Sequence, residues 1–171
     1  MYLGNIGPVA GVDLLLKAFI KTGLQNARLV IAGAGSMKGK IEEYAARFPK
    51  NKIEFWQVSK GKVPEVQSFA DVLLLPVKKG NTVTSVPSKL PAYMFSAKPI
   101  IAAVDKDSDA AEVILGAGCG FVTESGNIKS LVLAMRQIYK MDKKKLGRLG
   151  INGRDYALTN LSKKANLPKI I

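Results

Sequence analysis

Residues 2–11 read Tyr2-Leu3-Gly4-Asn5-Ile6-Gly7-Pro8-Val9-Ala10-Gly11 and give the clearest indication of the fold. It is a short apolar run that enters a glycine-rich turn. An amphipathic segment follows, in which apolar residues recur at the spacing of one helical face. These residues are Val12, Leu15, Leu16, Phe19 and Ile20. A strand, a glycine turn and a helix in this order predict the first unit of a parallel α/β sheet.

Apolar runs and amphipathic segments alternate along the rest of the chain, which predicts an α/β fold with parallel strands. We expect a Rossmann-like, doubly wound sheet of six parallel strands in a single domain over residues 1–171. After the strand that ends at Leu3, the further strands are expected over residues 28–32, 52–56, 71–76, 98–104 and 120–123. The further helices are expected over residues 36–47, 64–69, 88–96, 108–116 and 127–141, with Ser36 and Ser88 as N-caps.

The segment from residue 142 onward is rich in lysine and is expected to form a basic helical tail. Gly147, Gly150 and Gly153 are expected to break or kink it, because glycine weakens a helix interior. The basic residues suit a peripheral contact with an anionic membrane, and a solvated helix face is the alternative. They are Lys140, Lys143, Lys144, Lys145, Arg148, Lys163 and Lys164. No aromatic residues interleave with these lysines, which argues against nucleic acid as the partner.

The composition favours an anionic partner. The chain of 171 residues carries 26 Lys and Arg against 13 Asp and Glu, a formal charge of +13. A nucleotide, a nucleic acid or an anionic membrane surface would suit this charge. A basic surface that contacts only solvent would give the same net charge.

The sequence has no histidine and one cysteine, Cys119, which excludes zinc sites and Ser/His/Asp triads within this chain. We expect Cys119 to be a buried thiol and, without a signal peptide or membrane span in the sequence, a cytoplasmic protein.

Two loops are expected to meet where a doubly wound sheet binds ligands, at the carboxyl ends of the first and fourth strands. The first loop covers residues 4–11, and its Gly4, Asn5 and Gly7 can bring backbone N–H groups close to phosphate oxygens. A tight turn without a ligand is the alternative interpretation. The second loop covers residues 77–88 and leads into a helix.

Ser85, Ser88 and Lys89 form a second candidate anion site, which is expected to face the first loop. A serine hydroxyl and the first amides of a helix attract an anion, and Lys89 adds a full positive charge. The alternative is an ordinary serine cap beside a solvated lysine.

A third glycine-rich stretch, Gly33-Ala34-Gly35-Ser36-Met37-Lys38-Gly39, follows the second strand. Its spaced glycines, with Glu54 about twenty residues later, are typical of a dinucleotide site, so an NAD-binding oxidoreductase domain is one alternative. A non-enzymatic basic module that binds nucleic acid or anionic membrane is another. Because the motif follows the second strand instead of the first, we favour a helix-start turn in which Gly33 and Gly35 lie near the ligand.

The order and spacing of several blocks resemble the C-terminal domain of GT-B glycosyltransferases of the large retaining family 4, over nearly the whole chain. The blocks are Tyr2-Leu3-Gly4-Asn5-Ile6-Gly7, Gly11-Val12-Asp13-Leu14-Leu15, Leu29-Val30-Ile31-Ala32-Gly33-Ala34-Gly35, Ala70-Asp71-Val72-Leu73-Leu74-Leu75-Pro76, Ser88-Lys89-Leu90, Lys98-Pro99-Ile100-Ile101-Ala102 and Gly118-Cys119-Gly120. The resemblance implies that this domain binds a nucleoside-diphosphate sugar as donor, for retaining transfer without a metal ion or other cofactor. It also implies an acceptor bound by a separate N-terminal domain. We therefore expect this chain to be the excised C-terminal half, inactive alone.

The resemblance also shows where this chain departs from the family. Family members carry an Arg and a Lys for the diphosphate where Asn5 and Ala10 stand here. They also carry two acids, one before and one within the helix that follows the fourth strand. Thr84 and Ala92 stand at these two positions here. Thr84 is thus expected near the ligand, and the positive charge for the diphosphate is expected to come from Lys89 or from the missing domain.

The family resemblance places the donor base beside Gln57 and Val58, although the glycine expected after Phe55 is missing or displaced. A branch that assembles capsule, O-antigen and related polysaccharides resembles this chain more closely, because it shares Gly-Asn-Ile-Gly and the Pro-Ser-Lys of residues 87–89. That branch implies a UDP-sugar donor and a polysaccharide or lipid-linked acceptor, handled at the inner face of the plasma membrane.

Overall fold

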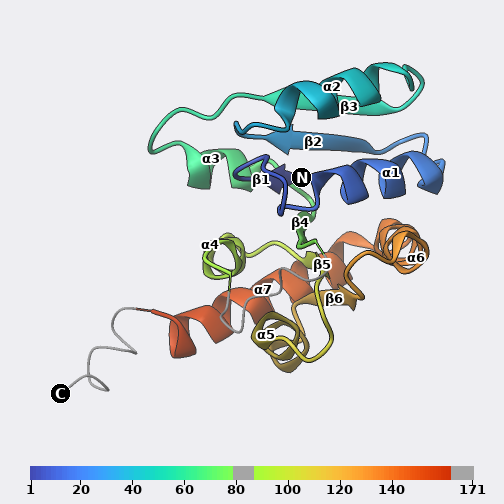
Figure 1. Ribbon diagram of the computed structural model, residues 1–171. Coiled ribbons are helices and arrows are strands. Elements are labelled where there is room, and N and C mark those ends of the chain that lie inside the picture. Colours follow the sequence, from blue (N-terminus) through green and yellow to red (C-terminus); the bar gives the residue numbers. More distant parts are fainter. Residues whose placement is uncertain (79–86, 163–171) are drawn as a thin grey trace.

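The computed structural model describes residues 1–78 and 87–162. Within them, six parallel strands form two three-stranded sheets with helices on both sides (Figure 1). The first sheet has the order β1-β2-β3 and consists of Tyr2–Leu3, Arg28–Ala32 and Lys52–Trp56. The second has the order β4-β5-β6 and consists of Leu73–Pro76, Ile100–Ala103 and Gly120–Thr123.

Seven helices lie in the described part of the chain. They are α1 (Val12–Thr22), α2 (Lys38–Ala46), α3 (Val63–Ser68), α4 (Lys89–Phe95), α5 (Asp109–Ala117), α6 (Ile128–Tyr139) and α7 (Lys143–Asn160). The predicted α/β fold with six parallel strands is confirmed, and the strands over residues 28–32, 52–56 and 120–123 have the predicted bounds.

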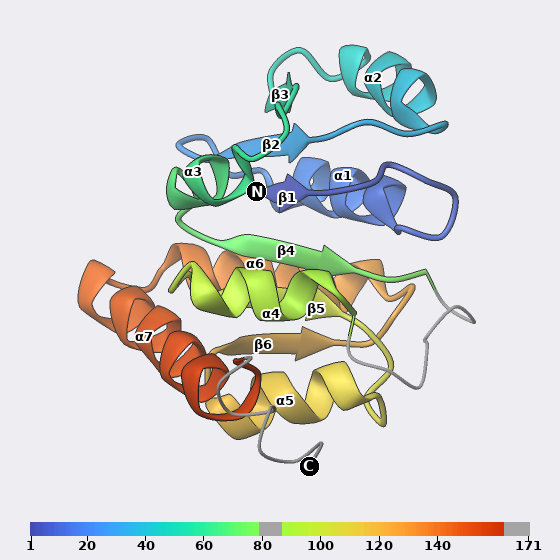
Figure 2. The same ribbon diagram turned by 90° about the vertical axis from the view of Figure 1, so that its left-hand side faces the viewer.

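The two sheets meet at Met1, so that β1 lies beside β4 (Figure 2). The Met1 nitrogen donates to the Val72 carbonyl at 2.6 Å, and the Leu74 N–H donates to the Met1 carbonyl at 2.8 Å. Two residues later, at Leu3, the Tyr93 hydroxyl takes the place of β4, because it accepts from the Leu3 N–H and donates to the Leu3 carbonyl, both at 3.0 Å. With the two sheets joined at this junction, the strands follow the doubly wound order 3-2-1-4-5-6.

Each face of the strands carries its own apolar core. α1 and α6 cover one side, and α3 and α4 cover the other (Figure 1). Along β2 the side chains alternate between the two cores, with Leu29 and Ile31 in the first and Val30 and Ala32 in the second. A strand that is buried on both faces needs apolar residues throughout, which explains the continuous apolar run of β2.

Of the two predicted serine caps, the one at Ser36 is wrong and the one at Ser88 is confirmed in position only. α2 begins at Lys38, and the Met37 N–H donates to the Ile6 carbonyl, so contacts of the backbone replace the predicted Ser36 cap. Ser88 does stand at the N-cap of α4, but its hydroxyl makes no capping hydrogen bond. Its φ of −55° and ψ of −22° are helical, whereas a capping serine needs an extended backbone.

The prediction that glycines break the C-terminal tail is also wrong, because α7 is continuous from Lys143 to Asn160. Two of its glycines are needed for close packing. A Cβ atom on Gly150 would lie 2.0 Å from the Ala97 carbonyl oxygen, and one on Gly153 would lie 3.0 Å from the Cys119 Cβ. Glycine therefore lets α7 approach its neighbours, and this contact outweighs the poor helix propensity.

We expect opposite effects from alanine at two glycines of α7. Gly147 has no atom within 4 Å of an added Cβ, so Gly147→Ala should raise the free energy of unfolding by about 0.5–1 kcal/mol. Gly150→Ala should lower it by about 2 kcal/mol, since the backbone at Ala97 must move. Urea denaturation of both variants checks this. If both variants changed the free energy of unfolding equally and in the same direction, this would contradict the close approach of α7 to the backbone at Ala97.

The single thiol is buried, as predicted. Cys119 has no exposed surface, and burial raises the pKa of its thiol to about 11. It is therefore inert at neutral pH, because the thiolate is the reactive form.

Candidate functional site

The first loop is fixed by backbone contacts with the loop that follows β2. The Gly4 N–H donates to Ala32 at 2.9 Å, and the Ile6 N–H donates to Ala34 at 2.8 Å. Gly33 and Gly35 allow this approach. A Cβ on Gly33 would lie 2.1 Å from the Gly4 carbonyl oxygen, and one on Gly35 would lie 2.4 Å from the Ile6 carbonyl oxygen. Both glycines also have positive φ, 135° and 153°.

The Asn5 side chain folds back over the same loop. A Cβ on Gly35 would lie 2.6 Å from its Oδ1, and a Cβ on Gly7 would lie 3.0 Å from its Nδ2. Within the described residues no group accepts a hydrogen bond from the backbone N–H of Asn5 or Gly7. The loop therefore offers two free donors at the carboxyl end of β1, immediately before α1.

Lys89 reaches this loop from α4. A Cβ on Gly4 would lie 2.2 Å from the Lys89 Cε, so the lysine side chain passes directly over Gly4. The Lys89 Nζ donates to the Tyr2 hydroxyl at 3.1 Å and lies 5.1 Å from the centre of the Tyr2 ring. Partial burial lowers the pKa of Lys89, and burial raises the pKa of Tyr2 to about 12. The tyrosine hydroxyl thus stays protonated and donates to the Asn5 carbonyl.

Sequence reasoning missed the two tyrosines that place Lys89. Tyr2 accepts from Lys89, while Tyr93 binds the backbone of Leu3, and both tyrosines are fully buried. Lys89 and Tyr93 are four residues apart on α4 and so lie on the same face of that helix. The sequence signal for Tyr93 was this spacing of four residues. A tyrosine on the same helix face as a functional lysine directs its hydroxyl toward the strand that the lysine also reaches, here β1.

Removal of one hydroxyl should loosen this link. Tyr93→Phe should lower the free energy of unfolding by about 1–3 kcal/mol, because the Leu3 N–H and carbonyl lose a buried partner. Tyr139→Phe is the matched control, since that tyrosine is 45% exposed, and its stability should stay within about 0.5 kcal/mol of the parent. Urea denaturation of both variants measures the difference. A Tyr93→Phe variant as stable as the control would contradict this role.

The structure brings together six of the predicted site residues: Gly4, Asn5, Gly7, Gly33, Gly35 and Lys89. Gln57 and Val58 directly follow β3, and the Trp56 carbonyl beside them accepts from the Gly33 N–H at 3.0 Å. Ser88 and Ala92 are exposed at α4, and Thr84 and Ser85 lie outside the described residues.

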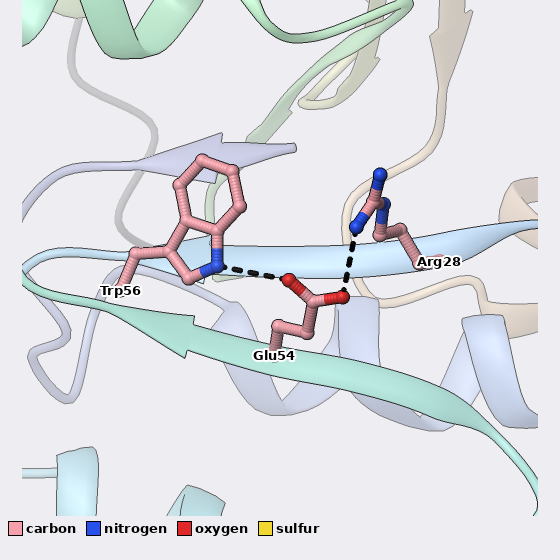
Figure 3. Close-up of polar contacts among 3 residues, drawn as sticks. All are labelled: Arg28, Glu54 and Trp56. Carbon is pink, nitrogen blue, oxygen red and sulfur yellow. Dashed lines mark hydrogen bonds and ion pairs between the residues drawn. The ribbon is translucent and has the colours of Figure 1, made fainter.

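Glu54, the acid of the NAD alternative, has a different role (Figure 3). Its carboxylate accepts from the Arg28 guanidinium at 3.1 Å and from the Trp56 indole N–H at 2.9 Å. The Arg28 hydrogen bond, with that of Trp56, lowers the pKa of Glu54. Arg28 comes from β2 and Trp56 from β3, so Glu54 ties the two strands together, and each of its two oxygens accepts one of these hydrogen bonds.

The described part of the chain holds no group of three His, Cys, Asp or Glu side chains that could bind a metal ion. No helix among the described residues is long and apolar enough to cross a membrane. Lys140 is exposed at the end of α6, and four more basic residues are exposed at the start of α7: Lys143, Lys144, Lys145 and Arg148. Lys163 and Lys164 lie outside the described residues. Membrane contact by this basic segment stays a prediction.

Comparisons with known proteins find similar sequences and similar folds. A family model described as glycosyl transferases group 1 matches residues 1–156. WbjE of Pseudomonas aeruginosa, a probable glycosyltransferase, is 22% identical over 151 residues, which are 85% of this chain and 37% of that protein.

Two crystal structures share the fold. A mutant of S. aureus TarM, in complex with fondaparinux, α-GlcNAc-glycerol and UDP, has a TM-score of 0.82 at 17% identity, over 99% of this chain and 34% of that chain. Anabaena HepE in complex with UDP has a TM-score of 0.80 at 16% identity, over 99% of this chain and 46% of that chain. This chain therefore spans less than half of the length of each of these relatives.

Proposed function

Since the chain belongs to the glycosyl transferases group 1 family, we propose that it is the donor-binding half of a retaining sugar transferase. Its ligand is a nucleoside-diphosphate sugar. The acceptor, a polysaccharide or lipid-linked sugar, is held by another domain. The chain's share of WbjE, 37% of that protein, is in keeping with such a division.

One observation carries this proposal: the Lys89 ammonium lies over Gly4 and donates to Tyr2, whose hydroxyl donates to the Asn5 carbonyl, in the same loop that has free N–H groups at Asn5 and Gly7. Backbone donors orient phosphate oxygens but carry no net charge, and a lysine supplies the missing positive charge. The two elements come from opposite sheets and meet at the carboxyl ends of β1 and β4, where doubly wound folds bind ligands. A diphosphate is the class of ligand that uses both the backbone donors of the loop and the positive charge of the lysine.

The proposed chemistry follows from the same groups. As the bond between the donor sugar and the diphosphate breaks, negative charge collects on the leaving diphosphate. Lys89 and the amides of Asn5 and Gly7 stabilise that charge, which lowers the barrier to departure. The acceptor hydroxyl then bonds to the sugar carbon with retained configuration and gives its proton to the departing diphosphate.

UDP is the nucleotide that we propose, with its base beside Gln57 and Val58. Crystal structures of similar fold, those of the TarM mutant and HepE, contain UDP. The end of β3 lies next to the glycine loops through the bond between Gly33 and Trp56, so one nucleotide could reach from the loop to the base position.

Calorimetric titration of the 171-residue chain with UDP, GDP, NAD and single-stranded DNA, at two salt concentrations, tests the proposal. We expect UDP to bind more tightly than NAD and DNA. Tighter binding of NAD would contradict a donor site. Binding of DNA alone, with steep salt dependence and no base preference, would instead indicate a basic module that binds polyanions.

A further inference from the structure

α6 has an apolar inner face and a basic outer face. Its inner face packs in the first apolar core through four buried residues: Leu131, Ala134, Met135 and Ile138. Residues three and four positions apart lie on the same face of a helix. By this spacing the outer face holds four exposed residues: Lys129, Leu133, Arg136 and Lys140. Since α6 contains no aspartate or glutamate, the outer face is basic along its whole length.

The basic surface continues from α6 onto its neighbours. The Arg136 guanidinium donates to the Thr22 and Lys21 carbonyls at 3.1 and 3.3 Å, so the end of α1 lies beside it. At its carboxyl end α6 leads directly into α7. Within residues 128–148 the sequence has seven lysines and arginines against one acid, Asp142. The name basic face is used below for these exposed residues: Lys21, Lys129, Leu133, Arg136, Lys140, Lys143, Lys144, Lys145 and Arg148.

Two features of the basic face are unfavourable in water alone. Residues 143–145, the first of α7, are all lysines, although the positive end of a helix dipole favours acids. Asp142 caps this end and pairs with Lys145 at 3.7 Å. Leu133 is 64% exposed in the middle of the basic outer face of α6. Departures from local stability rules are expected at functional surfaces. A partner that carries negative charge and admits an apolar side chain would offset both.

We propose that the basic face binds the surface of an anionic lipid membrane. Each lysine or arginine close to an anionic bilayer strengthens binding by about fivefold. Leu133 enters the boundary between headgroups and acyl chains, while the lysine stems beside it lie along apolar surface and keep their ammonium groups at the lipid phosphates. A nucleic acid would use the same charges but not Leu133, since its backbone presents phosphates to a basic surface.

This contact also determines the direction in which the donor site opens, a consequence that rests on the proposed function. α6 follows β6 and runs back along the sheet, opposite in direction to the strands (Figure 2). A bilayer along the outer face of α6 therefore lies parallel to the strands. The loop of Gly4 and Lys89, at the carboxyl ends of the strands, then opens sideways along the bilayer, toward a lipid-linked acceptor in the same membrane.

Co-sedimentation of the 171-residue chain with lipid vesicles tests the proposal. We expect binding to vesicles that contain phosphatidylglycerol, none to vesicles of phosphatidylcholine alone, and weaker binding as the salt concentration rises. Lys129→Glu with Lys140→Glu should weaken binding by more than about 20-fold, because two attractions become repulsions. The matched control is Lys50→Glu with Lys52→Glu. It has the same net charge, changes exposed lysines at the far edge of the first sheet, and should weaken binding about threefold or less.

Leu133→Ser distinguishes a membrane from other anionic partners. It should weaken binding to phosphatidylglycerol vesicles by about fivefold, because an apolar side chain no longer enters the bilayer. Leu115→Ser is the matched control, since Leu115 is 60% exposed on α5, outside the basic face, and this variant should bind like the parent chain.

Equal affinities of the two charge-reversal variants for anionic vesicles would show that net charge alone matters and would overturn the proposal. Binding of single-stranded DNA without binding of vesicles, lost in the Lys129→Glu and Lys140→Glu variant, would also overturn it, because the basic face would then be a nucleic-acid surface. Titration of the same variants with UDP separates this proposal from the donor site. UDP affinity should stay at the parental value, so each proposal can fail without the other.

Discussion

Lys89→Ala should weaken the binding of UDP by about 10- to 100-fold. The variant loses a charge-assisted hydrogen bond, which contributes about 1.5–3 kcal/mol. The loss should be near the upper end because the side chain is half buried and aligned over Gly4 by Tyr2. Calorimetric titration with UDP measures it. Lys52→Ala is the matched control, since Lys52 is an exposed lysine at the amino end of β3, the opposite edge of the sheet.

The pH dependence separates the charge of Lys89 from its bulk. Burial lowers the pKa of Lys89, and only the protonated amine supplies positive charge. UDP affinity should therefore be full at neutral pH and should fall as the pH rises through the lowered pKa, earlier than for an ordinary lysine. Lys89→Arg should remove this alkaline decline, because the guanidinium stays protonated. Identical affinities for the parent chain, Lys89→Ala and Lys52→Ala would refute the role of Lys89.

Gly33→Ala should lower the free energy of unfolding by about 3 kcal/mol. Two costs add. A methyl group at this position meets the Gly4 carbonyl oxygen at 2.1 Å, and the φ of 135° is strained for any residue with a side chain. The obstacle is backbone that β1 holds in place, so it cannot rotate away as a side chain would. Urea denaturation measures the loss.

The control for this variant lies six residues further along. Gly39→Ala adds a methyl group with no atom within 4 Å, inside α2, and should stabilise the protein by up to about 1 kcal/mol. In the folded fraction, Gly33→Ala should also weaken UDP binding, because the first loop is displaced. A Gly33→Ala variant with parental stability would show that the two loops are not in backbone contact.

The strands were predictable because each is a local pattern. Residues 29–32 are apolar on both faces, and this run, with Arg28 directly before it, predicted the bounds of β2. The position of the site followed from topology, since the carboxyl ends of β1 and β4 must adjoin in a doubly wound sheet. Hence Gly4, Asn5 and Lys89 could be placed together before any contact between them was known.

Contacts between distant residues were not predictable in the same way. The hydroxyl of Tyr93 interrupts the strand ladder at Leu3, 90 residues away in the sequence, and no local pattern reports it. Glycines raise the same difficulty. Gly147 and Gly150 look alike in the sequence, yet only the second lies against another backbone. Glycine in a helix predicts weakness when it faces solvent and close packing when it faces a neighbour.

The backbone bonds that fix the first loop bear on the thermodynamics of any ligand that it meets. Gly4 and Ile6 are held by carbonyl groups of the neighbouring loop before a ligand arrives. Binding then costs little conformational entropy from the chain, because these residues are already ordered. The measured entropy should come from released water and from the ligand's own rotors. Variants that loosen the loop should consequently change the entropy of binding more than its enthalpy.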